Sequence, residues 1–142
     1  MTKYLLDTNI IIFLFKSKHR IHEKMAFVGL QNCFISEITL AELKIGAEKS
    51  NNPSANHQLI NTLANTTTVL PITDALDVFA SEKIRLEKAG TPMHDNFDVL
   101  IAATALVNNL VMVTQNVKHF MVYDHLVVED WTMLGLPNGF DG

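Results

Sequence analysis

Near the start of the chain lies the stretch Tyr4-Leu5-Leu6-Asp7-Thr8-Asn9, in which an apolar run stops abruptly at a carboxylate, a hydroxyl and an amide. A second apolar segment, residues 10–15, follows directly. The pattern predicts a short buried strand, a polar turn that contains Asp7, and a helix. In open α/β sheets ligands bind outside the carboxyl ends of the strands, so Asp7 is a candidate site residue. A simple helix N-cap explains Asp7 equally well, because aspartate is strongly preferred there.

The alternation of strands and helices continues along the chain. Strands are expected at residues 32–36, 66–70, 110–113 and 125–128, and helices at residues 37–49, 55–64, 73–88 and 95–107, with a short one ending at residue 120. This order favours an α/β fold with a mostly parallel sheet, helices on both faces and right-handed crossovers. We expect a single domain over residues 1–134 and a flexible tail over residues 135–142.

Composition restricts the class of protein. The 142 residues are 48% hydrophobic and 18% charged, which is typical of a compact soluble domain. The net charge is −4, so contact with nucleic acid would need a local basic patch. Cys33 is the single cysteine, which excludes an internal disulfide and a Cys-based zinc site. The sequence has no convincing signal peptide and no apolar run that could span a bilayer, so we expect a cytoplasmic protein without membrane contact.

Two further carboxylates occupy positions where a negative charge is costly. When the helix 37–49 is stepped round at about 100° per residue, Glu42 falls inside the apolar arc. Asp98 lies at the start of a helix that is apolar nearly all round. A salt bridge with Lys49 would compensate Glu42, and the helix dipole would explain Asp98. A metal ion would satisfy both.

The three acids Asp7, Glu42 and Asp98 would repel one another strongly if they met in space. Two like charges about 4 Å apart cost about 4 kcal/mol at an effective dielectric constant near 20. Either the acids share a proton or a cation lies between them. An all-oxygen site suits Mg²⁺, with Mn²⁺ as a possible substitute, rather than Zn²⁺. Such a site can activate water, hold a phosphodiester and stabilise the leaving oxygen.

A basic stretch follows the first predicted helix. One interpretation is a solvated helix start, and the other is a rim that contacts RNA phosphates. The candidate RNA-binding side chains are those of this stretch together with one on the water-facing side of helix 37–49: Lys16, Lys18, Arg20 and Lys44.

Four segments of the chain together resemble the motif blocks of a PIN domain, and within that family the VapC-type toxin branch. They are residues 5–9, 35–47, 95–103 and 113–120, and the closing residues 128–131 are also similar to that branch. The resemblance covers nearly the whole chain and implies a PIN-like three-layer fold with about five parallel strands flanked by helices. It also implies a Mg²⁺-dependent endoribonuclease, a hydrolase of the EC 3.1 class that acts on RNA. Such a toxin would form a homodimer and be neutralised by a VapB-type antitoxin in a higher toxin–antitoxin assembly.

The resemblance assigns roles by position. Asp7, Glu42 and Asp98 match the family's metal-binding acids and are the candidate catalytic residues. Asn116 falls where many members have a fourth acid and others an amide, and Asp95 is an extra carboxylate that is either an N-cap or a water-mediated metal contact. Small polar residues near the acids could orient carboxylates or waters: Thr8, Asn9, Ser36, Thr39 and Thr114. In the expected reaction, an activated water attacks the RNA phosphorus and the 3′-oxygen leaves.

Other classes of protein fit the sequence less well. Haloacid-dehalogenase-like phosphatases also have a strand-end aspartate, but they need a second aspartate two residues later, where this chain has Asn9. A response-regulator receiver would need an acidic pair before the phosphorylated strand, and Asp7 has no such pair before it. The non-enzyme alternative is a PIN-like module that binds RNA or an antitoxin without cleavage, although the presence of all three acids argues against it.

Overall fold

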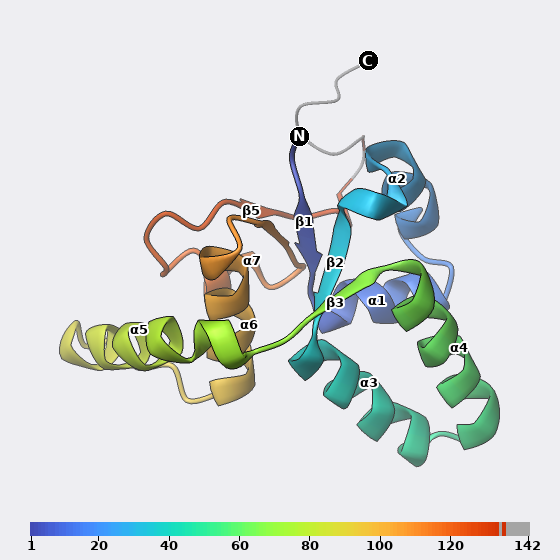
Figure 1. Ribbon diagram of the computed structural model, residues 1–142, viewed down its shortest axis with the longest axis horizontal. Coiled ribbons are helices and arrows are strands. Elements are labelled where there is room, and N and C mark those ends of the chain that lie inside the picture. Colours follow the sequence, from blue (N-terminus) through green and yellow to red (C-terminus); the bar gives the residue numbers. More distant parts are fainter. Residues whose placement is uncertain (134, 136–142) are drawn as a thin grey trace.

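The computed structural model describes residues 1–133 and residue 135, and within them five strands form one parallel sheet (Figure 1). The strand order is β3-β2-β1-β4-β5, and each neighbouring pair is parallel. The strands are β1 (Tyr4–Leu6), β2 (Cys33–Ser36), β3 (Thr68–Leu70), β4 (Val111–Val113) and β5 (Val128–Glu129). The predicted α/β class with a parallel sheet of about five strands is therefore confirmed.

Helices connect the strands in the expected alternation. They are α1 (Thr8–Phe15), α2 (Ile21–Val28), α3 (Glu37–Lys49), α4 (Pro53–Thr66), α5 (Leu76–Lys88), α6 (Asn96–Val107) and α7 (Val117–Phe120), with 3₁₀ turns at Leu30–Asn32 and Thr73–Ala75. The helix starts follow local capping chemistry. Ser36 accepts the N–H of Thr39 at the start of α3, and Asp95 accepts the N–H of Phe97 at the start of α6.

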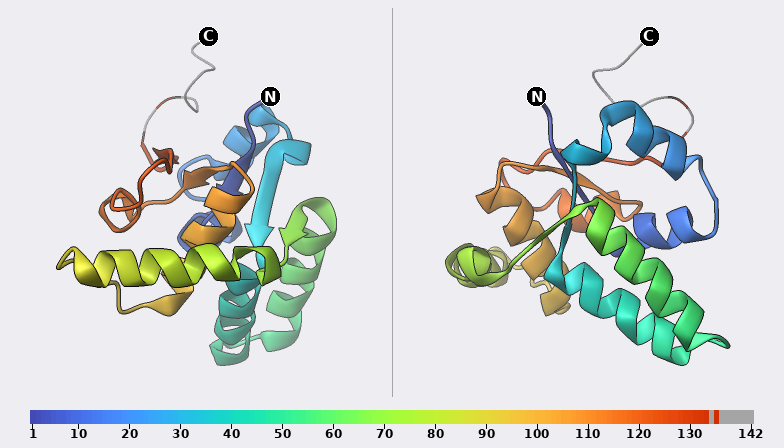
Figure 2. Two further views of the ribbon diagram at one scale, coloured as in Figure 1. Left: turned by 60° about the vertical axis from the view of Figure 1, so that its left-hand side comes forward. Right: turned by 45° about the vertical axis from the view of Figure 1, so that its right-hand side comes forward.

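The apolar strands supply two hydrophobic cores, because successive side chains of a strand point to opposite faces of the sheet. Tyr4 and Leu6 pack in one core with apolar residues of α1, α2, α3 and α4. Leu5, between them, packs in the other core with apolar residues of α5 and α6. The helices consequently lie on both sides of the sheet, as the two views of Figure 2 show. The fold therefore has three layers, with the sheet in the middle.

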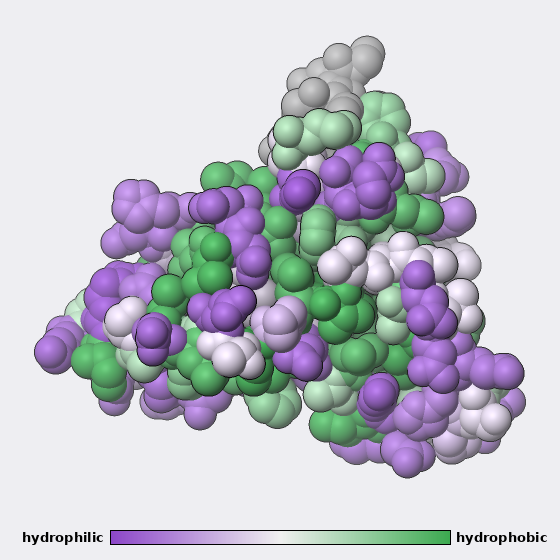
Figure 3. Space-filling model, viewed as in Figure 1, coloured by the Kyte–Doolittle hydropathy of each residue, from purple (hydrophilic) through white to green (hydrophobic). Residues whose placement is uncertain are grey.

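The helices leave a gap in the ribbon below the carboxyl ends of the central strands. In Figure 1, α5 extends to the left and the α3–α4 pair to the lower right, while β1 and β2 run downwards between them. On the face seen in Figure 3, hydrophobic residues gather towards the middle and hydrophilic residues cover the outer side of α4. The polar ends of the central strands thus emerge between two groups of helices.

The structure corrects some predicted boundaries. The last strand is limited to Val128–Glu129 instead of residues 125–128, because His125 has a φ of +67°, which strands do not use. Helix α4 runs to Thr66, so β3 starts at Thr68 instead of residue 66. The predicted flexible tail lies outside the described residues except for Gly135. None of the described helices combines the length and the apolar composition that crossing a bilayer requires.

Candidate active site

Asp7 follows β1, the strand at which the order of strand addition switches from one side of the sheet to the other. From β1 the chain builds β2 and β3 on one side, and it later adds β4 and β5 on the other. The backbone N–H of Asp7 donates to the carbonyl of Val113 at the end of β4, at 2.9 Å. Open α/β sheets bind ligands in the crevice at such a switch point, outside the carboxyl ends of the strands.

A cleft of about 270 Å³ opens at this point. Four carboxylates line it together with three polar side chains and one apolar side chain: Asp7, Glu42, Asp95, Asp98, Thr8, Asn9, Asn116 and Ile12. The structure therefore brings together the three acids that the sequence singled out, which come from the turn between β1 and α1, from α3 and from α6. It also adds Ile12 of α1, which sequence reasoning did not include.

Asp7 is buried, at 4% exposure, and hydrogen bonds hold both of its carboxylate oxygens. Oδ1 accepts the N–H of Thr8 at 2.8 Å, which caps α1. Oδ2 accepts the hydroxyl of Thr114 at 2.8 Å and lies 3.4 Å from the side-chain amide of Asn9. The N-cap interpretation and the site interpretation of Asp7 are thus compatible, because one carboxylate both caps the helix and lines the cleft.

Glu42 is held from the other side of the cleft by Thr8. The Thr8 hydroxyl donates to Glu42 Oε1 at 2.7 Å, and the hydroxyl of Thr39 lies 3.1 Å from that of Thr8. No ion pair between Glu42 and Lys49 exists in the described part of the chain, so the expected structural salt bridge is not observed. Glu42 is half-buried rather than enclosed by apolar neighbours.

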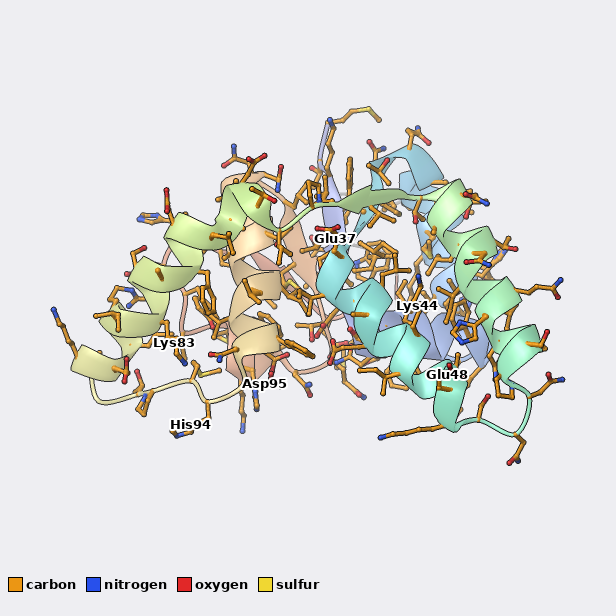
Figure 4. All side chains as sticks on the ribbon, turned by 60° about the horizontal axis from the view of Figure 1, so that its bottom comes forward. Glu37, Lys44, Glu48, Lys83, His94 and Asp95 are labelled. Atoms are coloured by element: carbon orange, nitrogen blue, oxygen red, sulfur yellow. The ribbon has the colours of Figure 1, made fainter. Side chains whose placement is uncertain are left out.

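Asp95 and Asp98 lie at the start of α6. Asp95 accepts the N–H of Phe97 at 2.9 Å and is exposed at the rim (Figure 4), so its role as an N-cap is observed. Asp98 is more enclosed, with 21% of its side chain exposed, and its Oδ2 lies 3.8 Å from Nδ1 of His119. His119 was not among the site residues predicted from the sequence, and the structure brings it next to Asp98.

Of the other predicted site residues, Asn116 lines the cleft, whereas Thr39 and Ser36 do not. The side chain of Asn116 lines the cleft, and its N–H donates to the Thr114 hydroxyl oxygen at 3.0 Å. Thr39 is buried and touches the cleft only through Thr8. Ser36 is fully buried and caps α3 without lining the cleft.

Burial and the repulsion of neighbouring carboxylates make the ionised forms of Asp98 and Asp7 unfavourable. Burial raises the pKa of Asp98 to about 6, the negative charges of Asp95, Asp7 and Glu42 also raise it, and His119 opposes them. Burial likewise raises the pKa of Asp7, while hydrogen bonds from Thr114 and Thr8 lower it. Repulsion among several carboxylates around one cleft favours a cation at this position.

The donor set fits Mg²⁺ better than a metal that needs a closed cage. In the part of the chain that the structure describes, no group of three or more His, Cys, Asp and Glu side chains could hold a metal ion. Mg²⁺ usually keeps several waters and binds through one or two carboxylates together with a phosphate, so an open cleft with carboxylate and amide oxygens suits it. Zn²⁺ would prefer nitrogen and sulfur ligands.

The predicted RNA-binding side chains lie outside the cleft. Lys18 and Lys44 are exposed, and Figure 4 labels Lys44 on α3. Arg20 is also exposed but pairs with Glu23, with Nε 2.8 Å from the carboxylate. Lys16 lines a neighbouring groove of about 350 Å³ that shares Glu42 and Ile12 with the cleft. The other residues of this groove are mostly apolar: Phe15, Leu43, Gly46, Ala47, Asn56, Leu59 and Ile60.

Comparisons with known proteins show which family and which relatives the chain is similar to. Residues 4–124 match the model of the PIN domain family. The chain is 37% identical over 134 residues to the tRNA(fMet)-specific endonuclease VapC of Shigella flexneri, covering 93% of this chain and 100% of that protein. It is 35% identical over 133 residues to ribonuclease VapC2 of Haemophilus influenzae, covering 92% and 99%.

Two solved structures are similar to the whole domain. VapBC-1 from nontypeable Haemophilus influenzae superposes with a TM-score of 0.81 at 36% identity, covering 93% of this chain and 100% of that one. DNA-bound VapBC from Salmonella typhimurium superposes with a TM-score of 0.83 at 33% identity, covering 92% and 99%.

Proposed function

The chain belongs to the PIN-domain family, and from this premise we propose that it is a metal-dependent endoribonuclease that acts as the VapC-type toxin of a toxin–antitoxin pair. Relatives at 35–37% identity over more than nine tenths of the chain are named as ribonucleases or as a tRNA-specific endonuclease. One observation of this chain supports the proposal above all others: Asp7, Glu42 and Asp98, from three separate elements, line one open cleft at the switch point of the sheet.

Different residues of the chain would bind the metal, orient the carboxylates and accept a proton. Asp7 and Asp98 would be the main metal ligands, and Glu42 would orient a water. Thr114 and the N–H of Thr8 keep the Asp7 carboxylate in one orientation, while the Thr8 hydroxyl fixes Glu42. A bound Mg²⁺ would supply activation of the attacking water and stabilisation of negative charge on the phosphate. A carboxylate of the cleft would accept a proton from the water as its oxygen bonds to phosphorus, while the bond to the 3′-oxygen breaks and that oxygen takes a proton from solvent.

RNA is the substrate class that this proposal assigns. Lys16 lies beside the cleft in the adjoining groove. Lys18, between α1 and α2, and Lys44, on α3, are exposed cations. Contacts from such side chains to phosphates position RNA without reading its sequence. Because one relative is named for tRNA(fMet), that tRNA is the first substrate to test.

A VapB-type antitoxin is the proposed protein partner, since the similar solved structures are VapBC complexes. The apolar groove between α1, α3 and α4 shares Ile12 and Glu42 with the cleft, so a protein segment bound there would also cover the acids. Apolar side chains such as Ile45 and Ile84 are exposed and offer further surface for a second copy of the chain. A homodimer within a higher assembly is therefore part of the proposal.

The proposal is tested by cleavage of tRNA(fMet) and total RNA with Mg²⁺, with Mn²⁺ and with EDTA. The variants Asp7→Asn and Asp98→Asn should lose cleavage while keeping their circular-dichroism spectrum. Asp77→Asn, in the exposed first turn of α5, is the matched control and should cleave like the parent. If the parent binds RNA but cleaves none with either metal, the non-catalytic module is correct. Cleavage by Asp7→Asn at the parent rate would disprove the assignment of the acids.

A further inference from the structure

We propose that His119 contacts the RNA backbone at the Asp98 end of the cleft, where its ring donates a hydrogen bond to a phosphodiester oxygen. This inference rests on the proposed function, because it names a residue that holds the same substrate. It adds a substrate contact beside Asp98, whereas Lys16 lies in the groove that shares Glu42 with the cleft.

The backbone around His119 is firmly placed. Helix α7 is one turn long, and its last residue, Phe120, is fully buried. The N–H of His119 donates to the carbonyl of Asn116 at 3.0 Å, and the N–H of Asn116 donates to Thr114 Oγ1 at 3.0 Å. Since the Thr114 hydroxyl also binds Asp7, the turn that presents His119 is tied to the same strand end as the acids.

The imidazole ring lies at the edge of the cleft, and one of its two nitrogens has no partner among the described residues. Its Nδ1 is 3.8 Å from Asp98 Oδ2, and 59% of the side chain is exposed. Its Nε2 makes no hydrogen bond with any described residue. Because the ring is largely exposed to solvent, the contact with Asp98 adds little to the stability of the fold. A neutral imidazole has one N–H and a protonated one has two, so the ring can donate in either form.

The cleft itself needs such a donor. Four carboxylates line it, and no Lys, Arg or His of the described residues does. A phosphate approaching the acids is therefore repelled except where a cation or an N–H donor compensates its charge. Lys16 lies at the Glu42 side, in the adjoining groove, and His119 lies at the Asp98 side. An RNA strand bound over the acids could therefore meet one donor beside Glu42 and another beside Asp98.

The test compares His119→Phe, which keeps an aromatic ring but has no donor, with His119→Gln, which keeps a side-chain N–H. The control is His57→Phe on α4, which replaces another partly exposed histidine paired with a glutamate, at 3.7 Å from Glu48. Binding of labelled tRNA(fMet) is measured in EDTA, where no cleavage occurs, and KM and kcat are measured with Mg²⁺. The Mg²⁺-induced shift in melting temperature gives a third reading.

We expect His119→Phe to weaken RNA binding by about 3–10-fold and to raise KM by a similar factor, as for loss of one exposed hydrogen bond. His119→Gln should stay within about twofold of the parent, and the Mg²⁺-induced shift should be unchanged in both. Equal RNA binding by the parent and His119→Phe would overturn the inference. So would a loss of the Mg²⁺ shift without a loss of RNA binding, because His119 would then act only on Asp98. If the parent cleaves no RNA, the proposed function fails, but the binding comparison in EDTA still decides the role of His119.

Discussion

Replacing Asp98 by asparagine should make the metal-free protein more stable while it abolishes cleavage. The pKa of Asp98 rises from 3.8 to about 6, first because of burial and then because of Asp95, Asp7 and Glu42. A shift of about two pH units corresponds to about 3 kcal/mol when the carboxylate is ionised. The side chain is 21% exposed, so solvent screens part of this repulsion. The dipole of helix α6 stabilises a negative charge in its first turn by about 0.3–1 kcal/mol, which offsets part of the destabilisation.

The net gain for Asp98→Asn at pH 7.5 without metal is therefore about 1–2 kcal/mol, or about 3–6 °C in melting temperature. The sign follows from the raised pKa. Between pH 3.8 and about 6 the folded state binds more protons than the unfolded state, so the stability of the parent falls as pH rises. The advantage of the variant should therefore be small near pH 4 and complete above about pH 7.

The assay is thermal and urea unfolding of parent and variant in EDTA and in Mg²⁺, from pH 4 to pH 8. Saturating Mg²⁺ stabilises the parent by about 2.7 kcal/mol at one hundred times Kd, whereas the variant should gain little, so the order of the two melting temperatures should reverse. The matched control is Asp77→Asn, in the first turn of α5, which should lose only the small dipole contribution. If metal-free Asp98→Asn is no more stable than the parent at pH 7.5, or if its advantage persists unchanged at pH 4, the electrostatic reasoning is wrong.

Other residues give separate predictions. Thr114→Val removes the hydroxyl that binds Asp7 at 2.8 Å and should weaken Mg²⁺ binding about tenfold in titration calorimetry, and an unchanged affinity would contradict that role. Gly46 lies within α3, where an added Cβ meets no atom within 4 Å, so Gly46→Ala should raise the free energy of unfolding by up to about 1 kcal/mol. Gly46→Phe should fill the groove and reduce inhibition by a VapB-type antitoxin without slowing RNA cleavage; full inhibition would show that the antitoxin binds elsewhere. Lys24→Met removes two hydrogen bonds to the carbonyls of Trp131 and Met133 and should cost about 1–3 kcal/mol in urea unfolding, whereas an unaltered midpoint would show that these bonds add nothing.

The start and end of individual elements could be predicted because they depend on nearby residues. Helix α3 runs over Glu37–Lys49 as its sequence predicts, because the side-chain oxygen of Ser36 accepts a backbone N–H of the first turn. The carboxylates Asp7 and Asp95 act in the same way at α1 and α6. The last strand was misjudged because apolar residues suggested an extended segment, whereas the positive φ of His125 depends on how the loop packs.

The sequence by itself determined the alternation of strands and helices, the helix caps and the presence of three acids in unfavourable positions. These features follow from side-chain periodicity and from hydrogen bonds between residues only a few positions apart. Only the tertiary structure decided which groups meet: Glu42 with the Thr8 hydroxyl, Asp7 with Thr114, and Asp98 with His119. The strand order β3-β2-β1-β4-β5 sets these pairs, because it makes β1 and β4 neighbours although more than one hundred residues separate them. No local pattern specifies that contact, since it forms only when both faces of the sheet bury their apolar side chains at once.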